Sequence, residues 1–314
     1  SATQGSAGGY YATIDSLGET TLTGRVLNPE LLGSVNTSNT GASLVVVGDY
    51  AYVANENSVD GFEVFDISDP SVPVRVGVAN AAASMLDIAV SGAYVYTVNG
   101  FAIQIYDVSD PSNPVSVSST DVTTSPVAIA VSGSYAYIGY NNSSQEFEIY
   151  DISDPLLPKF VGGVTAASYV SDIAVSGSYA YVTSNSTDVE FEVFDISDPT
   201  SPVQVGTAVL SNGATSVTIS GKYAYVTAYS SVGDEFEIID ISDPTNPSKV
   251  GGVNNSVSFL ETAITGNYAY VTESVSGDEV IVFDISSSTN PVEVGSYKHT
   301  EAVNFAHVSG SYLY

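Results

Sequence analysis

Apolar and polar residues alternate in short runs along most of the chain, and no stretch has the spacing of an amphipathic helix. In residues 170–206, Ile173 and Val175 alternate with small or polar residues, and Tyr179 and Tyr181 do the same. Two further runs, "FEVFD" and the Pro-bounded "PVQVG", complete the segment. Because a period of two is typical of β-strands, this segment predicts four short strands.

The same unit recurs every 41 to 45 residues. Its first anchor is a Gly-x-Tyr-x-Tyr phrase or a close variant, at Gly48, Gly92, Gly133, Gly177, Gly221, Gly266 and Gly310. Its second anchor is Asp-x-Ser-Asp-Pro, at Asp66, Asp107, Asp151, Asp195 and Asp240, with a degenerate copy at Asp284. Four short strands per unit of this length indicate a propeller blade. The seven Gly-Tyr anchors predict an all-β, seven-bladed β-propeller of four-stranded blades.

The seventh unit has only the first anchor, so its second half must come from elsewhere in the chain. Closed propellers commonly build one blade from both chain ends. The run "YYATID" (10–15) resembles a third strand, and "NPELLGSV" (28–35) aligns with "NPVEVGSY" (290–297), with a seven-residue insertion between the two runs. We expect Tyr10, Tyr11, Ile14 and Asp15 to form the closure strand. The same strand could instead pair with a neighbouring molecule's open blade and link subunits head to tail.

These patterns predict one domain after a short flexible segment at residues 1–9. The propeller is expected to span residues 10–314. Its blades are predicted at about 42–79, 84–120, 125–164, 170–208, 214–253, 258–297, and 302–314 plus 10–35.

The Asp-x-Ser-Asp-Pro motif predicts a turn after each third strand, because Asp accepts hydrogen bonds from nearby backbone amides and Pro fixes φ. A calcium site is the alternative interpretation of these repeated acids. The tyrosines recur in every unit, which favours packing between strands and blades over a ligand-binding cluster.

Composition excludes several classes of partner. The net charge is -29, with 35 acidic residues against six basic ones. Nucleic acid and anionic membrane surfaces are therefore not expected as partners, because both require clustered Lys and Arg. No apolar run is long enough to insert in a bilayer. The absence of cysteine excludes disulfides and thiolate metal sites.

Two groups of acids depart from a plain repeat. Asp87, Asp172 and Glu261 lie five residues before their glycine anchors, on strands expected to line the central channel. They could bind a hard cation such as calcium at one channel mouth, although no cofactor is required. A second group alternates with apolar residues near the third strands, at Glu63, Glu146, Glu148, Glu190, Glu192, Glu235, Glu237 and Glu279. We expect these side chains on the exposed side of the blades, as a solvated face or as a cation-bridged contact surface.

The remaining features favour an exported protein. Ser, Thr, Asn and Gly replace charge on the expected surface, and the start at Ser1 rather than Met suggests that a leader has been removed. Sequons for N-glycosylation begin at Asn36, Asn141, Asn142, Asn185 and Asn254.

The repeated core, "FEVFDISDPSVPVRVG" at 62–77 and "FEVFDISDPTSPVQVG" at 191–206, resembles the LVIVD repeat family of surface-associated propellers of bacteria and archaea. The resemblance covers residues 42–297. It implies a propeller fold and a surface location, and it assigns no activity.

No catalytic constellation is apparent. The two histidines, His299 and His307, belong to no Ser-His-Asp order and to no metal-ligand spacing. We therefore expect a non-catalytic, extracellular structural or adhesive protein of the cell surface that self-associates into a surface layer or filament. The alternative is a monomeric surface module that binds a glycan or a protein.

Overall fold

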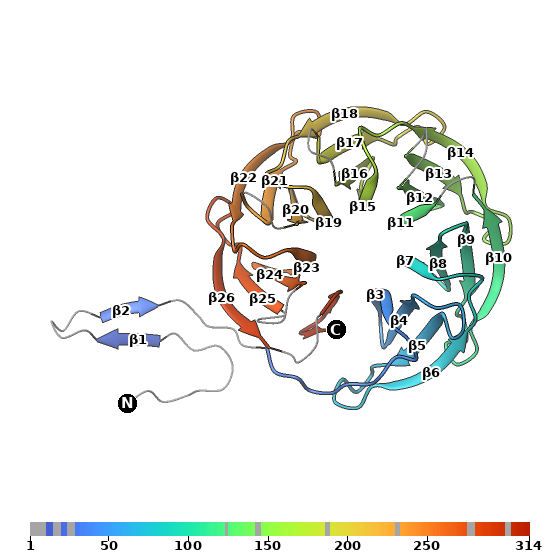
Figure 1. Cartoon of the computed structure of the whole chain (residues 1–314), viewed down its shortest axis with the longest axis horizontal. Helices are drawn as coiled ribbons and strands as arrows, with labels where there is room; N and C mark the ends of the chain where they lie inside the picture. Colours follow the sequence, from blue (N-terminus) through green and yellow to red (C-terminus); the bar gives the residue numbers. More distant parts are fainter. Residues whose placement is uncertain are drawn as a thin grey trace.

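The computed structural model is a ring of antiparallel sheets around a central opening (Figure 1). It describes residues 29–122, 125–141, 146–185, 189–229, 233–274, 280–298 and 303–314, and the backbone of strands at 11–14 and 20–23. Among these residues, no helix is long and apolar enough to cross a membrane.

Six sheets contain four strands each, and the strands follow one another in sequence order from the centre of the ring outward. The first three blades consist of β3 (Gly41–Val47), β4 (Tyr50–Asn55), β5 (Phe62–Asp66) and β6 (Val74–Ala79); β7 (Met85–Ser91), β8 (Tyr94–Asn99), β9 (Ala102–Asp107) and β10 (Val115–Asp121); and β11 (Pro126–Ser132), β12 (Tyr135–Tyr140), β13 (Phe147–Asp151) and β14 (Lys159–Val164). The next three consist of β15 (Val170–Ser176), β16 (Tyr179–Ser184), β17 (Phe191–Asp195) and β18 (Val203–Ala208); β19 (Ala214–Ser220), β20 (Tyr223–Ala228), β21 (Phe236–Asp240) and β22 (Ser248–Val253); and β23 (Phe259–Thr265), β24 (Tyr268–Glu273), β25 (Val280–Asp284) and β26 (Val292–Tyr297).

Both sequence anchors form tight turns. Gly177 has a φ of 61°, in the left-handed region that glycine adopts at no steric cost, and it turns the chain from β15 into β16. After β17, the Asp195 carboxylate accepts a hydrogen bond from the Ser197 amide at 2.9 Å. Asp198 accepts hydrogen bonds from the amide and the hydroxyl of Thr200. The prediction of a structural turn at this motif is therefore confirmed.

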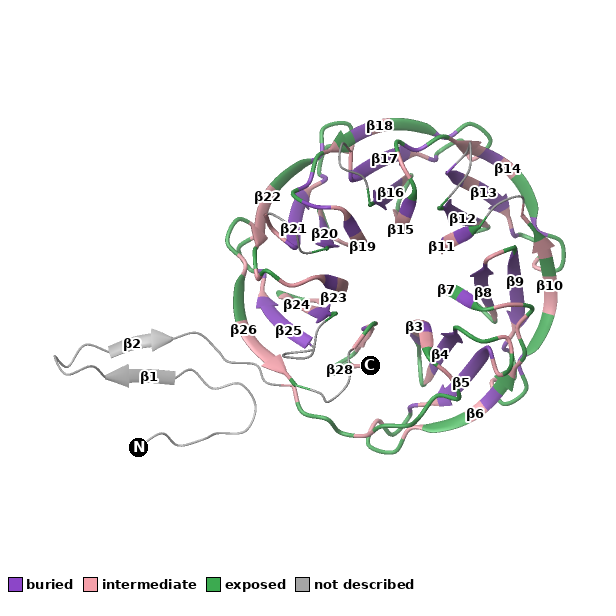
Figure 2. Ribbon diagram, viewed as in Figure 1, coloured by how far each residue is buried: buried purple, intermediate pink, exposed green. Residues whose placement is uncertain are grey.

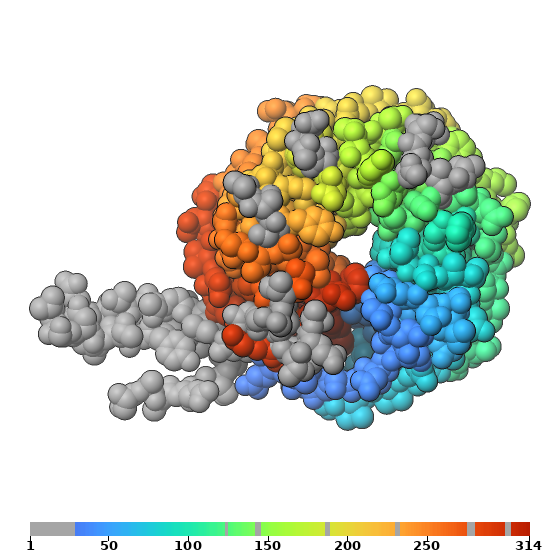
Figure 3. Space-filling model, in the orientation of Figure 1, coloured from blue at the N-terminus to red at the C-terminus, as the bar shows by residue number. Residues whose placement is uncertain are grey.

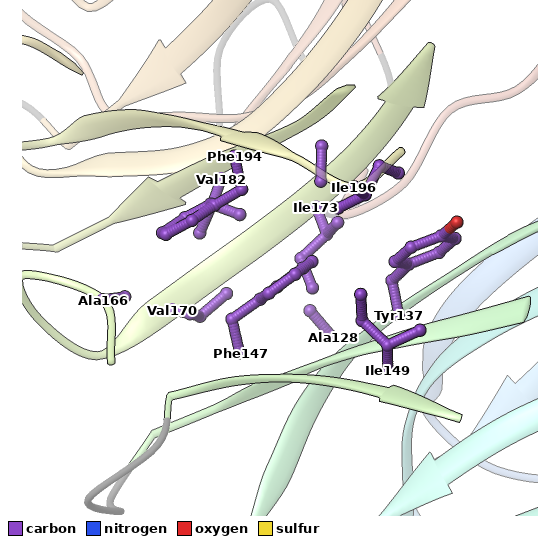
Figure 4. Close-up of a cluster of buried hydrophobic side chains, with 11 residues drawn as sticks. Ala128, Tyr137, Phe147, Ile149, Ala166, Val170, Ile173, Val182, Phe194 and Ile196 are labelled. Atoms are coloured by element: carbon purple, nitrogen blue, oxygen red, sulfur yellow. The ribbon is translucent and has the colours of Figure 1, made fainter. Parts of the chain in front are cut away.

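The hydrophobic core lies between the blades. Phe147 of β13 stacks on Phe194 of the next blade with ring centroids 5.1 Å apart, and Tyr137, Ile149 and Val182 are buried around them (Figure 4). Third strands are buried along most of their length, whereas fourth strands form the exposed rim (Figure 2). The predicted packing role of the tyrosines is confirmed at positions such as Tyr137.

The prediction of seven four-stranded blades, with the last closed by both chain ends, is wrong. The ring has six complete blades, and a two-stranded sheet of β27 (Val308–Ser309) and β28 (Tyr312–Leu313) lies between β23 and β3. The expected closure strand is β1 (Tyr11–Ile14), which pairs with β2 (Thr20–Thr23). The predicted insertion contains β2, and pairing with a strand so near in sequence costs less chain entropy than closing the ring. Residues 1–9, Tyr10 and Asp15 lie outside the described residues.

Close packing of neighbouring blades predicts a cost for Gly206→Ala. A Cβ at Gly206 in β18 would lie 2.8 Å from Pro247 Cδ and even closer to the Pro244 carbonyl oxygen in the turn of the next blade. We expect the substitution to lower the free energy of unfolding by about 2 kcal/mol, measured by urea denaturation. Gly100→Ala is the matched control, because a Cβ there meets nothing within 4 Å. Equal stability of the two variants would contradict the packing argument.

Candidate functional site

Three carboxylates on inner strands join neighbouring blades at the central channel. Asp87 Oδ1 accepts hydrogen bonds from the Ser43 hydroxyl at 2.9 Å and from its neighbour's amide, and Oδ2 accepts one from the Ile129 amide at 2.8 Å. Asp172 accepts a hydrogen bond from the Val217 amide at 2.8 Å. The Ile129 and Val217 amides lie on the inner strands of the blades that follow those of Asp87 and Asp172. The two aspartates therefore hold adjacent inner strands together.

Glu261 occupies the same position in the sixth blade. Its Oε2 accepts a hydrogen bond from the Ala306 amide at 3.3 Å, just before β27. Ala306 stands four residues before its glycine anchor, as Ile129 and Val217 do. The interaction thus repeats at the junction with the C-terminal hairpin.

Burial changes the titration of these three acids. Although each side chain is half-buried and borders the channel, desolvation raises the pKa of Asp87 to about 7, and the charge of Asp172 adds to the shift. Desolvation likewise raises the pKa of Asp172, and it raises that of Glu261 well above its usual value together with the charges of the two aspartates. These groups bind protons more readily in the folded ring than in the unfolded chain.

The predicted cation at Asp87, Asp172 and Glu261 stays a prediction. Their oxygens accept backbone hydrogen bonds, as described above. In the part of the chain that the structure describes, no group of three or more His, Asp or Glu side chains is arranged to hold a metal ion. The three carboxylates are instead placed to join neighbouring blades. The sequence signal for this role was that Ser43 and Ser216, in adjacent units, occupy the same position, five residues before the glycine anchor, as the acids do.

The second group of acids is not on an exposed side of the blades, so that prediction is wrong. Most of these side chains are buried, namely Glu63, Glu146, Glu190, Glu192, Glu235 and Glu237, whereas Glu148 is half-buried and Glu279 lies outside the described residues. Strand alternation places residues on two faces, but a third strand inside a propeller has a neighbouring blade against each face. Both faces are therefore interior.

These buried carboxylates bind the linkers that connect successive blades. Glu190 accepts a hydrogen bond from the Leu210 amide at 2.8 Å, and Glu237 of the following blade accepts one from the Ser211 amide at 2.7 Å. One blade earlier, Glu146 and Glu192 bind the consecutive amides of residues 166 and 167 in the same way. Each of these linkers is thus held by one carboxylate from the blade it leaves and one from the blade it enters.

Side chains on the fourth strands, two cations and one amide, complete three of these sites. Lys249 Nζ lies 3.1 Å from Glu237 Oε2, and Arg75 lies 2.5 Å from Glu63 Oε1. Burial alone would raise the pKa of Glu63, but hydrogen bonds from Arg75 and its neighbours lower it overall. Glu192 has Gln204 in place of a cation, and its pKa is raised, mainly by burial.

The seventh position of the ring is incomplete. His307 and Tyr314 exchange two backbone hydrogen bonds, of 3.0 and 2.9 Å, which makes β27 and β28 the equivalents of the two inner strands of a blade. Tyr314 packs against Val46, Val53 and Phe65 of the first blade. No described strand pairs with the outer edge of β28.

The outer rim of this position is formed by residues 29–35, which follow the edge of the ring toward β6 (Figure 1). A Cβ at Gly33 would lie 2.5 Å from the Ser71 carbonyl oxygen and 2.7 Å from that of Pro70, in the turn after β5. Gly206 meets the next blade's turn in the same way. The predicted alignment of residues 28–35 with a fourth strand is therefore correct in position, although no described residue of this segment is in a strand.

The third-strand position between β28 and residues 29–35 has no described occupant. Leu32 shows the consequence, because its side chain is 56% exposed, whereas its equivalents Val76 and Val205 are half-buried against the core. Unpaired strand edges readily accept another strand. Within the described part of the ring, a further strand could therefore pair with β28 at this position.

Other predicted residues have simple surroundings. The sequon residues Asn36, Asn141, Asn185 and Asn254 are exposed, and Asn142 lies outside the described residues. His307 is half-buried, and desolvation lowers its pKa. His299 also lies outside the described residues. Glycosylation at the sequons stays a prediction.

The channel carboxylates predict stability that falls as pH rises. The pKa of Asp87 is about 7 in the folded ring and near 4 in the unfolded chain, so the folded state binds more protons between these values. The free energy of unfolding should therefore decrease from pH 5 to pH 8. Asp87→Asn should reduce this decrease by about 2 kcal/mol, allowing for screening by channel water.

Urea denaturation at pH 5 and pH 8 measures the free energy of unfolding of each protein. The difference between the two pH values is compared between variant and wild type, because the substitution also alters hydrogen bonding at both. Asp69→Asn is the control, since hydrogen bonds from Ser71 lower the pKa of Asp69 and move its titration below this window. An unchanged pH dependence in Asp87→Asn would show that Asp87 does not titrate there.

Comparison with known proteins places this ring in a family. A model of the LVIVD repeat matches residues 41–80, 84–122, 127–166, 167–208, 213–255 and 261–299. No curated protein matches the chain.

Several solved structures are similar in fold. A functionally unknown protein from Desulfotomaculum acetoxidans has a TM-score of 0.72 at 15% identity, with coverage of 85% of this chain and 89% of that one. A chain of the mitotic checkpoint complex has a TM-score of 0.67 at 12% identity and 92% coverage of both chains. A chain of hydrazine synthase from Kuenenia stuttgartiensis has a TM-score of 0.61 at 16% identity, with 82% and 78% coverage. Such identities show the fold alone. The six repeat matches cover most of the sequence, and the chain belongs to the LVIVD repeat family.

Proposed function

We propose that this protein is a non-catalytic, extracellular structural subunit that self-associates into a surface layer or filament. The observation that carries the proposal is the open third-strand position beside β28. β28 is short, but an unpaired strand edge of any length can pair with a strand of another molecule, and natural proteins usually cover such edges. The partner of this protein is another copy of itself.

The use of its acidic side chains supports a structural role. The carboxylates of half-buried Asp172 and of buried Glu190 and Glu237 bind backbone amides of inner strands and linkers between blades. They repeat in several blades, whereas a catalytic site requires one place where polar groups differ from the repeat. The half-buried His307 has no described ion-pair partner.

A cell-surface location is supported by the surface chemistry. Charged residues make up 13% of the chain, and four sequon asparagines are exposed. A hydroxyl-rich surface can pack closely against another copy once salt screens the repulsion of the net charge of -29. A cell-wall glycan or a surface protein could also contact this surface.

A monomeric module that binds a glycan or a protein is the second candidate. The opening at the middle of the ring favours it, because a space-filling view shows that side chains do not fill the centre (Figure 3). Half-buried Asp87, Asp172 and Glu261 give this channel an acidic lining. A soluble single ring whose melting temperature rises with a ligand would support this function.

Electron microscopy and light scattering of the full chain test self-association. We expect ordered filaments or sheets that grow as salt is raised from about 10 to 150 mM, because salt screens repulsion between copies of net charge -29. A matched sample with EDTA tests whether a cation bridges the contacts. Discrete single rings under all conditions would contradict the proposal and favour the binding module.

A further inference from the structure

We infer that β1 (Tyr11–Ile14) of a second copy occupies the third-strand position between β28 and residues 29–35, which no described residue of the ring fills. This inference deepens the proposed function and rests on it, since it names the contact by which copies associate. The position is already framed on both sides, by β28 within and by Gly33 at the rim. A single strand would complete a seventh four-stranded blade.

The sequence of β1 matches the third strands of the complete blades. Aligned on β5, Tyr11 takes the place of Phe62, Thr13 that of Val64 and Ile14 that of Phe65. In the complete blades the first of these positions holds an aromatic or aliphatic side chain that is buried, as in Phe62, Phe147, Phe191 and Phe236. Tyr11 and Ile14 therefore provide apolar side chains at two positions that the fold buries.

The aromatic pairs between blades show where Tyr11 would pack. Phe62 stacks on Tyr106 at 4.7 Å, Phe147 on Phe194 and Phe236 on Phe283, each pair joining a third strand to the next one. Phe65 of the first blade occupies the position that Tyr106, Phe194 and Phe283 occupy in these pairs. No aromatic ring among the described residues stacks on it. The ring of Tyr11 in an inserted strand would stack on Phe65 and continue the series.

The core at this junction is correspondingly small. The cluster around Phe65 contains five buried residues, whereas every other cluster in the described part of the ring contains at least nine. An inserted strand would add apolar side chains and would pair the free edge of β28 by main-chain hydrogen bonds. Strand addition of this kind gives affinity from the backbone and specificity from alternate side chains.

The connection between β1 and the rim favours a second copy over the same chain. Complete blades join third to fourth strand through residues such as 67–73, whereas residues 15–28 separate β1 from the rim segment. Once the pairing of β1 with β2 is released, these 14 residues can extend to about 45 to 50 Å, which is enough to cross between rings. In its own chain β1 is paired with β2, so the strand is presented outside the ring's seventh position. Exchange of an identical element between copies costs little.

Charge also favours insertion. Residues 1–14 contain no Asp, Glu, Lys or Arg, in a chain with a net charge of -29. A strand from this segment can approach an acidic ring without side-chain repulsion.

Engineered cysteines test the contact directly, because the natural chain has none. Val64 lies opposite Tyr52 in β4, so an inserted Thr13 should lie opposite Tyr314. Since Tyr314 exchanges its backbone bonds with His307, this pair is of the non-hydrogen-bonded kind, whose short Cβ separation suits a disulfide. We expect a mixture of full-length Thr13→Cys and Tyr314→Cys chains to form covalent heterodimers on mild oxidation.

Ala12→Cys mixed with Tyr314→Cys is the matched control. A shift of one residue turns the side chain to the opposite face of the strand, so this pair should give about tenfold less heterodimer. If Tyr314→Cys fails to fold, Ile14→Cys mixed with Leu31→Cys replaces it, because Phe65 lies opposite Arg75 and Leu31 is exposed.

The outcomes separate this inference from self-association itself. Filaments whose cysteine pairs cross-link no better than the control would overturn strand donation and leave self-association standing. A double variant, Thr13→Cys with Tyr314→Cys in one chain, that forms only an internal disulfide would show closure by the chain's own strand. Single rings with no cross-link would overturn both. A peptide of residues 9–16 added to the full chain should shorten the filaments if β1 is the donor, and a scrambled peptide should not.

Discussion

Packing between blades is the interaction on which this structure depends. Third strands of adjacent complete blades pack against each other, with stacked aromatic pairs such as Phe147 with Phe194 at three of these junctions and an aliphatic side chain on one side at the others. A four-stranded sheet cannot bury its two faces alone, so every blade requires two neighbours. The closed circle is therefore a condition of stability, and a single incomplete position affects the whole ring.

Carboxylates make the same junctions specific. If an acidic chain placed all of its carboxylates on the surface, they would repel one another without fixing any contact between blades. Here Glu190 and Glu237 bind adjacent amides of one linker, and Asp87 joins three successive blades. A buried carboxylate is costly unless it is hydrogen-bonded or protonated, and these groups use both means. Linker positions and inner-strand registers are thereby fixed by polar contacts, while aliphatic and aromatic side chains between the blades provide the apolar burial.

Sequence patterns predict the repeated part of this ring well and its exceptions poorly. The strands, the glycine turns and the rim position of Gly33 follow from periodicity and alignment, because each is a local property copied in every unit. The burial of Glu63 and Glu237 does not follow, since alternation separates two faces without indicating that both are covered. The pairing of β1 with β2 was missed for a different reason: β2 lies in a segment that looked like an insertion with no structure of its own.

The seventh position also constrains the order in which the molecule can form. Its rim segment, residues 29–35, precedes all six blades in the chain, whereas β27 and β28 follow them. Blades one to six depend mainly on neighbours that are close in sequence and can fold in succession behind the ribosome. The site beside β28 exists only once β27 and β28 have packed against the first blade. A chain that is still being synthesised can therefore donate β1 but cannot yet accept a strand beside β28. Two unfinished chains cannot join in this way, which limits assembly during translation.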